Sequence, residues 1–256
     1  GAASFAIPLA GEPLLSAAKT GGADVLGPGG LRGTVLAGDW PDRGLKAGDR
    51  LVASHEPSGV TVEESGPARV VVCIKGGYAP GDKDKKFYTF TARLTFAAND
   101  SAVRLVYTLE NTKLDPKLYD GEKGKSRFAY VWPLKDVSLV ADLAMGDKAT
   151  AWALGDGKLV SAEVAAEPLL VNQSRLDSFE ATLAGKQLAS GKEASGAIGV
   201  AAGGRGLAAA RRYLHSEWPG ALAGSAKELR IGLLPGESGE KFHFNIGQRK
   251  SWDLRL

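Results

Sequence analysis

The chain has 256 residues, of which 44% are hydrophobic and 24% charged, and its 32 basic and 29 acidic residues give a net charge of +3. This hydrophobic content is enough for a buried core and excludes a disordered chain. So small a basic excess is not typical of nucleic-acid binders. No apolar stretch reaches the length of about 18 residues that a membrane-spanning helix needs. The single cysteine excludes an internal disulfide and a cysteine-based zinc site.

The first half of the chain predicts a series of strands. The 34 glycines and 12 prolines favour a β-rich fold with many turns. Short apolar or alternating runs predict strands at 59–64, 68–75, 87–97 and 102–110. Residues typical of turns separate these runs, at 65–67, 76–82 and 99–101. Consecutive strands joined in this way predict an antiparallel meander.

Further strands are predicted at 137–143, 150–154, 159–164, 228–234, 241–246 and 251–256. Residues 174–188 have apolar side chains at partly helical spacing, and 206–222 are predicted as a strand followed by a one- or two-turn helix before Pro219. About ten to fourteen strands predict an all-β fold, a large antiparallel β-sandwich with one or two short helices. We expect residues 1–256 to form this sandwich as a single domain.

Several classes of catalytic site have no support in the sequence. The three histidines, His55, His215 and His243, show no paired metal-ligand spacing, so neither a metal site nor a cofactor is expected. There is no nucleophile elbow and no phosphate-binding loop. Cys73 lies in an apolar run, which favours a small buried side chain over a nucleophile.

The segment 211–218 carries the densest group of reactive side chains. Arg212, Tyr213 and His215 are the candidate catalytic residues, because β-elimination beside a uronate needs a cation for the carboxylate and a base for the proton. Arg211 and Trp218 are candidate substrate-binding residues, since a guanidinium binds a carboxylate and an indole stacks on a sugar face. The alternative, which base rates favour, is that the apolar members pack on the sheet and the charged ones are solvated.

A second candidate substrate-binding group, Tyr119, Arg127 and Trp132, lies in and after the polar segment 113–125. Aromatic rings with polar rims suit carbohydrate recognition. The alternative is that these residues anchor a loop or belong to the core.

Four stretches, 62–75, 93–111, 204–235 and 247–256, together resemble the exo-rhamnogalacturonan lyase-like family. The resemblance covers most of the chain from about residue 50, whereas 1–50 match only loosely. It implies a protein with an N-terminal β-barrel, a central β-sandwich and a C-terminal α/α toroid, of which this chain resembles the sandwich. That sandwich is of the supersandwich type, similar to polysaccharide lyases and galactose mutarotases. Because the toroid holds most of the family's cleft, no catalytic residue is carried over; Glu110, Asn111, Arg212 and Trp218 are only family-like positions.

Three functions follow as hypotheses. The first is a part of an exo-acting lyase that cleaves acidic polysaccharide by β-elimination, with an α/α-toroid domain or chain as partner and with the isolated chain inactive on its own. The second is a non-catalytic module for glycan binding or domain docking, and the third a mutarotase- or epimerase-like enzyme. Partners would be acidic poly- or oligosaccharides, not nucleic acid or membrane. The chain begins with Gly1 and shows no signal peptide, so we expect a processed protein, extracellular or periplasmic, or a part of a longer one.

Overall fold

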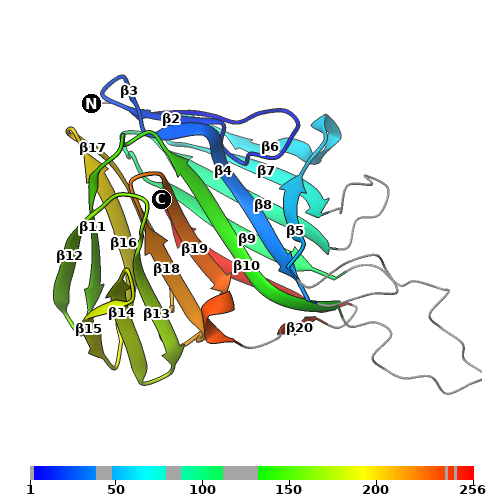
Figure 1. The fold of residues 1–256 in the computed structure, drawn as a ribbon. Helices are drawn as coiled ribbons and strands as arrows, with labels where there is room; N and C mark the ends of the chain where they lie inside the picture. Colours follow the sequence, from blue (N-terminus) through cyan, green and yellow to red (C-terminus); the bar gives the residue numbers. More distant parts are fainter. Residues whose placement is uncertain (1–2, 39–47, 79–87, 112–131, 240–241, 245–246) are drawn as a thin grey trace, which may run out of the picture.

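The computed structural model describes residues 3–38, 48–78, 88–111, 132–239, 242–244 and 247–256. Two large antiparallel sheets pack face to face, and a small sheet lies at one end (Figure 1). Sheet I has the order β6 (Val60–Ser65), β7 (Arg69–Tyr78), β8 (Tyr88–Ala97), β9 (Val103–Glu110), β21 (Arg249–Arg255), β17 (Arg205–Arg211), β16 (Ala194–Ala202), β11 (Ala149–Gly155) and β12 (Lys158–Val164).

Sheet II faces sheet I across the core. Its order is β5 (Arg50–Ser54), β4 (Leu26–Ala37), β10 (Trp132–Leu143), β19 (Glu228–Leu234), β18 (Gly220–Gly224), β13 (Leu169–Arg175), β14 (Ser178–Leu183) and β15 (Lys186–Gly191), with β20 (Phe242–Phe244) paired to the start of β10. Strand β5 also pairs with the end of β7, so it joins the two sheets along one side. The small sheet consists of β1 (Ala3–Ala6), β2 (Ala17–Thr20) and β3 (Ala23–Asp24).

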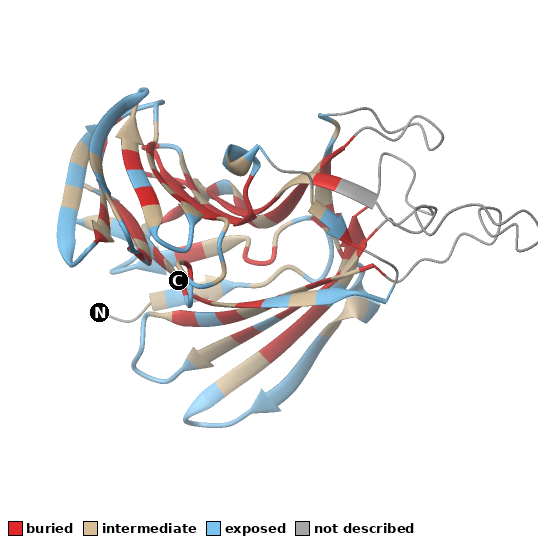
Figure 2. Ribbon diagram, turned by 90° about the horizontal axis from the view of Figure 1, so that it is seen from below, coloured by how far each residue is buried: buried red, intermediate tan, exposed pale blue. Residues whose placement is uncertain are grey.

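The predicted all-β class and the large antiparallel sandwich are confirmed. The four runs from 59 to 110 form β6 to β9 as the expected meander. The turn at 156–157 joins the hairpin of β11 and β12, because both of its residues adopt the positive φ that such a tight turn requires. Along the strands, buried and exposed residues alternate (Figure 2), as expected where one face of each sheet meets the core.

The sequence was least informative at 174–188 and 212–218. Residues 174–188 complete β13 and form β14 and β15, so their partly helical spacing was misleading. The short helix expected before Pro219 is absent from the described residues, where 212–217 form turns. Tyr213 has a φ of 61°, a left-handed conformation that an α-helix does not allow. The helical residues of the described part are the 3-10 turns at Pro57–Gly59 and Gly236–Ser238, and none of its helices is long and apolar enough to cross a membrane.

The sheets approach each other closely around a pair of buried tyrosines. The hydroxyls of Tyr78 and Tyr107 share a hydrogen bond, and the ring of Phe90 stacks on Tyr107 with centroids 5.6 Å apart. Burial raises the pKa of both phenols, so both hydroxyls stay protonated. Gly33 on β4 faces this pair, where a Cβ atom would lie 2.5 Å from the oxygen of Tyr78. Glycine at 33 therefore permits the inter-sheet distance that the tyrosine pair sets.

We expect Gly33→Ala to lower the free energy of unfolding by about 1–3 kcal/mol, because overpacking a filled core forces backbone or rotamer shifts. Urea denaturation measures the change. Gly66→Ala is the matched control, since its Cβ would meet only a carbonyl oxygen at 3.7 Å. Equal stability of the two variants would contradict this account of the core.

Candidate functional site

An open pocket of about 600 Å³ lies on the outer face of sheet I, beside β9, β21 and the turn that follows β17. We call it the arginine pocket, after the three exposed arginines in its wall; the buried Arg211 lies beside them. Its polar and aromatic side chains include Arg104, Arg212, Arg255, Asp100, Asp253 and Tyr213. The volume is within the range of small-ligand sites, about 300–1,000 Å³.

Strand alternation places these side chains on the outer face. On β21, Trp252 and Leu254 are buried in the core, so Asp253 and Arg255 point outward. The register then sets Arg255 directly opposite Arg104 of β9. Two like charges in directly opposed positions destabilise a sheet pair. Two carboxylates of the chain, Asp253 and Asp100, relieve this repulsion.

Asp253 is the main counter-ion within the pocket. The Nε and Nη2 atoms of Arg104 donate to its two carboxylate oxygens, each at 2.9 Å. Nη1 of Arg212 lies 3.5 Å from one of these oxygens. The hydrogen bond from Arg104 is the first cause that holds the pKa of Asp253 below its usual range, so the carboxylate stays charged. Arg255 pairs instead with Asp100, at 2.7 Å.

Tyr213 lies at the edge of the pocket, and the residue is 53% exposed. The guanidinium of Arg212 lies over that ring, 4.7 Å from its centroid. Tyr213 also has a positive φ, which costs energy at a bulky residue. The exposed ring face and the adjacent cation together provide the two contacts that an acidic sugar requires.

Arg211, predicted to bind substrate, instead supports the turn. Its side chain points into the core and is fully buried, with Nη1 donating to the carbonyl of Gly232 at 2.8 Å and Nη2 to that of Glu217 at 2.9 Å. Burial lowers its pKa to about 10, and the nearby carboxylate of Glu217 opposes that shift. The alternation on β17 sends neighbouring side chains to opposite faces, which is why Arg211 and Arg212 have different roles.

The other predicted residues are not brought into the arginine pocket. His215 lies outside its lining, with Nδ1 3.2 Å from a carboxylate oxygen of Glu193. Trp218 is 44% exposed and is likewise outside the lining. Tyr119 and Arg127 lie outside the described residues, and Trp132 is described only as the backbone start of β10, opposite Phe244. The roles of these residues stay predictions.

The sequence interpretation missed Arg104, Arg255, Asp253 and Asp100. The alternation of apolar and polar residues in 102–110 and 251–256 could have located these side chains, since it places the charged residues on one face of each strand. It did not show that β9 and β21 are neighbours. That pairing joins residues almost 150 positions apart in the chain.

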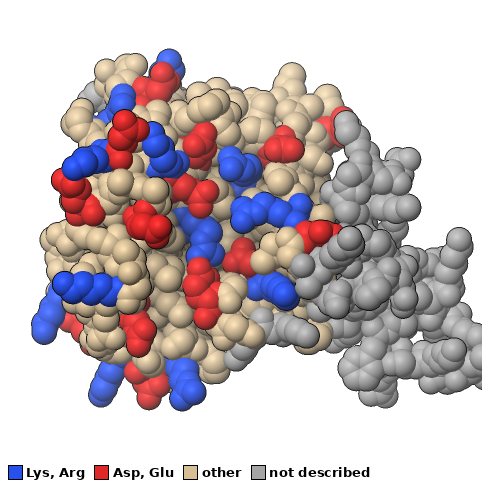
Figure 3. All heavy atoms as spheres, in the orientation of Figure 1, with Lys and Arg blue, Asp and Glu red and all other residues tan. Residues whose placement is uncertain are grey.

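Charges elsewhere are interspersed or internally satisfied. On the face drawn in Figure 3, basic and acidic side chains alternate without a continuous basic stripe. Arg230 on sheet II binds Asp136, Ser138 and Glu237, which fastens the turn at 236–238 to β10. In the described part of the chain, no group of three or more His, Cys, Asp or Glu residues is arranged to hold a metal ion.

Residues 1–123 match the family model described as "PcRGLX-like protein central beta sandwich domain". This confirms the predicted resemblance. The match includes 62–75 and 93–111, and also 1–50, where the sequence showed only a loose likeness; 204–235 and 247–256 lie beyond it. The match covers slightly less than half of the chain and describes a central β-sandwich. No curated protein matches the chain.

Three solved structures are similar to the chain at low sequence identity. A TPR-domain containing protein from Parabacteroides distasonis has a TM-score of 0.52 and 10% identity, over 94% of this chain and 43% of that one. A galactose mutarotase-like protein from Lactobacillus casei has a TM-score of 0.48 and 12% identity, over 98% of this chain and 95% of that one. GH36 α-galactosidase AgaA from Geobacillus stearothermophilus has a TM-score of 0.48 and 9% identity, over 93% of this chain and 30% of that one. This chain thus spans less than half of the first and third of these proteins, and the likeness concerns the fold alone.

We expect Arg211→Met to lower the free energy of unfolding by about 2–3 kcal/mol, because one buried and one partly buried carbonyl lose charged donors. Arg212→Gln, its exposed neighbour, should change stability by no more than about 0.5 kcal/mol. Urea denaturation of both variants checks this. A stable Arg211→Met variant would mean that Arg211 does not hold the turn.

Proposed function

We propose that this chain is the central sandwich of an exo-acting, polysaccharide lyase-like protein and that its arginine pocket binds acidic polysaccharide. The observation that carries the proposal is the direct opposition of Arg104 and Arg255, with Arg212 as a third cation, in an open pocket. Guanidinium groups bind carboxylates through paired hydrogen bonds. The exposed ring of Tyr213 adds an apolar face for a sugar.

The proposal assigns binding, rather than the whole reaction, to this pocket. β-Elimination needs a base beside the uronate proton as well as a cation for the carboxylate. Of the candidate bases, Tyr213 lines the pocket and His215 does not. We therefore expect turnover only with a second domain or chain that completes the cleft, an α/α toroid in the resembled family. An extracellular or periplasmic location for such an enzyme belongs to the same proposal.

A non-catalytic glycan-binding module is the second candidate. It is favoured by the ion pairing of the pocket's carboxylates, because Asp253 and Asp100 already bind arginines and are poorly placed as bases. The mutarotase-like alternative needs an imidazole and a carboxylate converging on a sugar. His55 is buried, with Nε2 3.1 Å from the carbonyl of Pro8, which leaves that alternative without a site there.

We expect Arg212→Gln to weaken the affinity for acidic oligosaccharides by about ten- to hundredfold, since a charged hydrogen bond contributes about 1.5–3 kcal/mol. Calorimetry with oligogalacturonate, and with a neutral oligosaccharide of equal length, measures the loss. Arg69→Gln is the matched control, because Arg69 is a similarly exposed, ion-paired arginine of β7 that does not line the pocket. Equal losses in both variants would reject the pocket as the binding site. Ultraviolet absorbance of an unsaturated product in the same samples separates a lyase from a binding module.

Asp253→Asn should have the opposite effect. Removing this carboxylate frees the guanidiniums of Arg104 and Arg212 for a ligand, so the affinity for oligogalacturonate should rise by several-fold and depend more steeply on salt. The same calorimetric titration at two salt concentrations checks this. A lower affinity in Asp253→Asn would show that Asp253 orients the arginines instead of competing with the ligand.

A further inference from the structure

The inner face of sheet I carries buried hydrogen-bond donors that lack an acceptor. Trp252 of β21 is buried in the core, and its indole Nε1 has no hydrogen-bond partner among the described residues. In the same part of the chain, Nε of the buried Arg211 on β17 has none either. A buried donor without a partner costs about 1–3 kcal/mol, and native proteins contain few of them. An acceptor close to these two N–H groups would remove that cost.

Strand pairing brings a second cation to the same place. Arg211 lies opposite Leu254, and Trp252 and Lys250 follow Leu254 in steps of two residues, so all of them share the inward side of the sheet. Nζ of Lys250 lies 5.6 Å from the centroid of the Trp252 ring. Burial lowers the pKa of Lys250, and the charge of Arg211 adds to that shift, whereas Glu217 opposes it. The two cations are therefore close enough to repel each other.

The charges of this group do not cancel. Arg211 and Lys250 are two cations, and the carboxylate of Glu217 is the counter-ion that acts on both. One oxygen of that carboxylate lies 3.7 Å from Nη2 of Arg211. One positive charge of the cluster is thus left over among the described residues. A water molecule would accept hydrogen bonds from the donors but leave this charge, whereas an anion satisfies both needs.

The surroundings of the guanidinium restrict such an anion to a small one. A Cβ atom on Gly220 would lie 2.7 Å from Nη1 of Arg211 and 2.5 Å from the side chain of Leu214. The space beside the guanidinium is therefore narrow. A monatomic anion suits it better than a carboxylate or a sugar.

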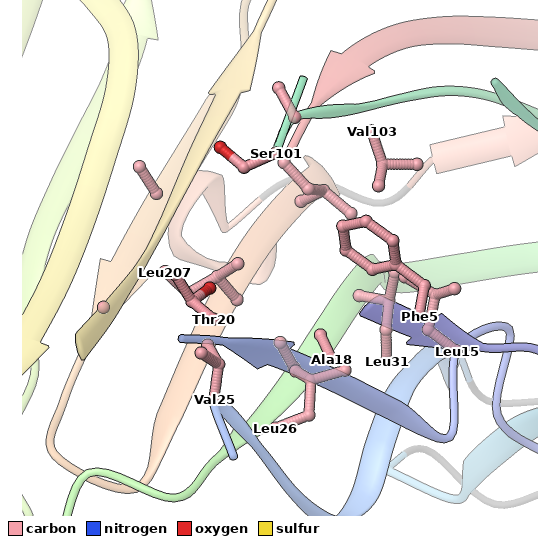
Figure 4. A pocket seen from close by; sticks show the side chains of 15 residues that line it. Phe5, Leu15, Ala18, Thr20, Val25, Leu26, Leu31, Ser101, Val103 and Leu207 are labelled. Carbon is pink, nitrogen blue, oxygen red and sulfur yellow. The ribbon is translucent and has the colours of Figure 1, made fainter. Parts of the chain in front are cut away.

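An apolar pocket of about 330 Å³ on the core side of sheet I provides the contrast (Figure 4). Phe5, Leu31 and Leu207 line it, and the polar side-chain atoms in its wall are the hydroxyls of Ser101 and Thr20. No charged side chain is among its described lining residues. An ion in that pocket would lose its hydration without gaining a charged partner. Within the core, the donors on β17 and β21 are thus the better anion site.

We propose that Nε1 of Trp252, Nε of Arg211 and the ammonium group of Lys250 together bind one small inorganic anion such as chloride. The anion accepts hydrogen bonds from these groups and supplies the missing negative charge. It lies beside the turn 212–217, which Arg211 holds through the carbonyl of Glu217, so the bound anion stabilises that turn. The proposal goes beyond glycan binding, because Lys250 and Trp252 do not line the arginine pocket.

The indole N–H resonances of the isotope-labelled chain test this site directly. Chloride replaces gluconate, an anion too large for the space, at constant ionic strength. We expect a saturable shift of the assigned Trp252 resonance, and none for Trp152, whose neighbours on β11 are the buried residues Ala151 and Ala153. Without a saturable shift at Trp252, water is the acceptor and the proposal is overturned. An equal shift at Trp152 would overturn it too, as a general effect of salt.

A pair of lysine variants tests the role of the ammonium group. Lys250→Met should weaken the chloride affinity by about tenfold, because it removes one donor and its charge. Lys148→Met is the matched control, since Lys148 is an exposed lysine that pairs with Glu163 on the far side of sheet I. Chloride should raise Tm of the wild-type chain and of Lys148→Met, but not of Lys250→Met. Equal chloride responses of the two variants reject the site, and the wild-type titration decides the matter even where a variant fails to fold.

Discussion

The pairing of β21 with both β9 and β17 is the interaction on which the rest of sheet I depends. Strands β6 to β9 form one meander, and β11, β12, β16 and β17 form another set of hairpins. Strand β21 lies between them and makes them one sheet. The same pairing brings Arg255 opposite Arg104 and places Asp253 within reach of two arginines. On the β17 side, the pairing joins Ala210 and Arg211 to Arg255 and Leu254.

A second constraint acts through Arg211, which ties the turn after β17 to both layers of the sandwich. Its guanidinium binds a carbonyl of sheet II and a carbonyl within the turn. Arg212 donates its backbone N–H to the carbonyl of Asp253 on β21. With these two anchors, Arg212 and Tyr213 are held at the edge of the arginine pocket. The buried cation therefore positions residues that act on the opposite face of the sheet.

Two adjoining pockets lie in the same region of the sandwich. The outer face is polar and cationic, which suits an acidic ligand, whereas the core side is apolar. Ala102 lies at the boundary between them.

Local pattern alone determined the β class, the meander from 59 to 110, the hairpin at 156–157 and the burial of Cys73, because alternation and turn chemistry act between near neighbours. It also singled out 211–218, yet it could not separate the buried Arg211 from the exposed Arg212. Partly helical spacing misled at 174–188, where pairing with neighbouring strands overrides a weak local preference. Only the tertiary structure decided the arginine pocket, since Arg104 and Asp253 meet through a strand pairing that spans most of the chain. Such pairings depend on the packing of whole sheets, which no short stretch of sequence encodes.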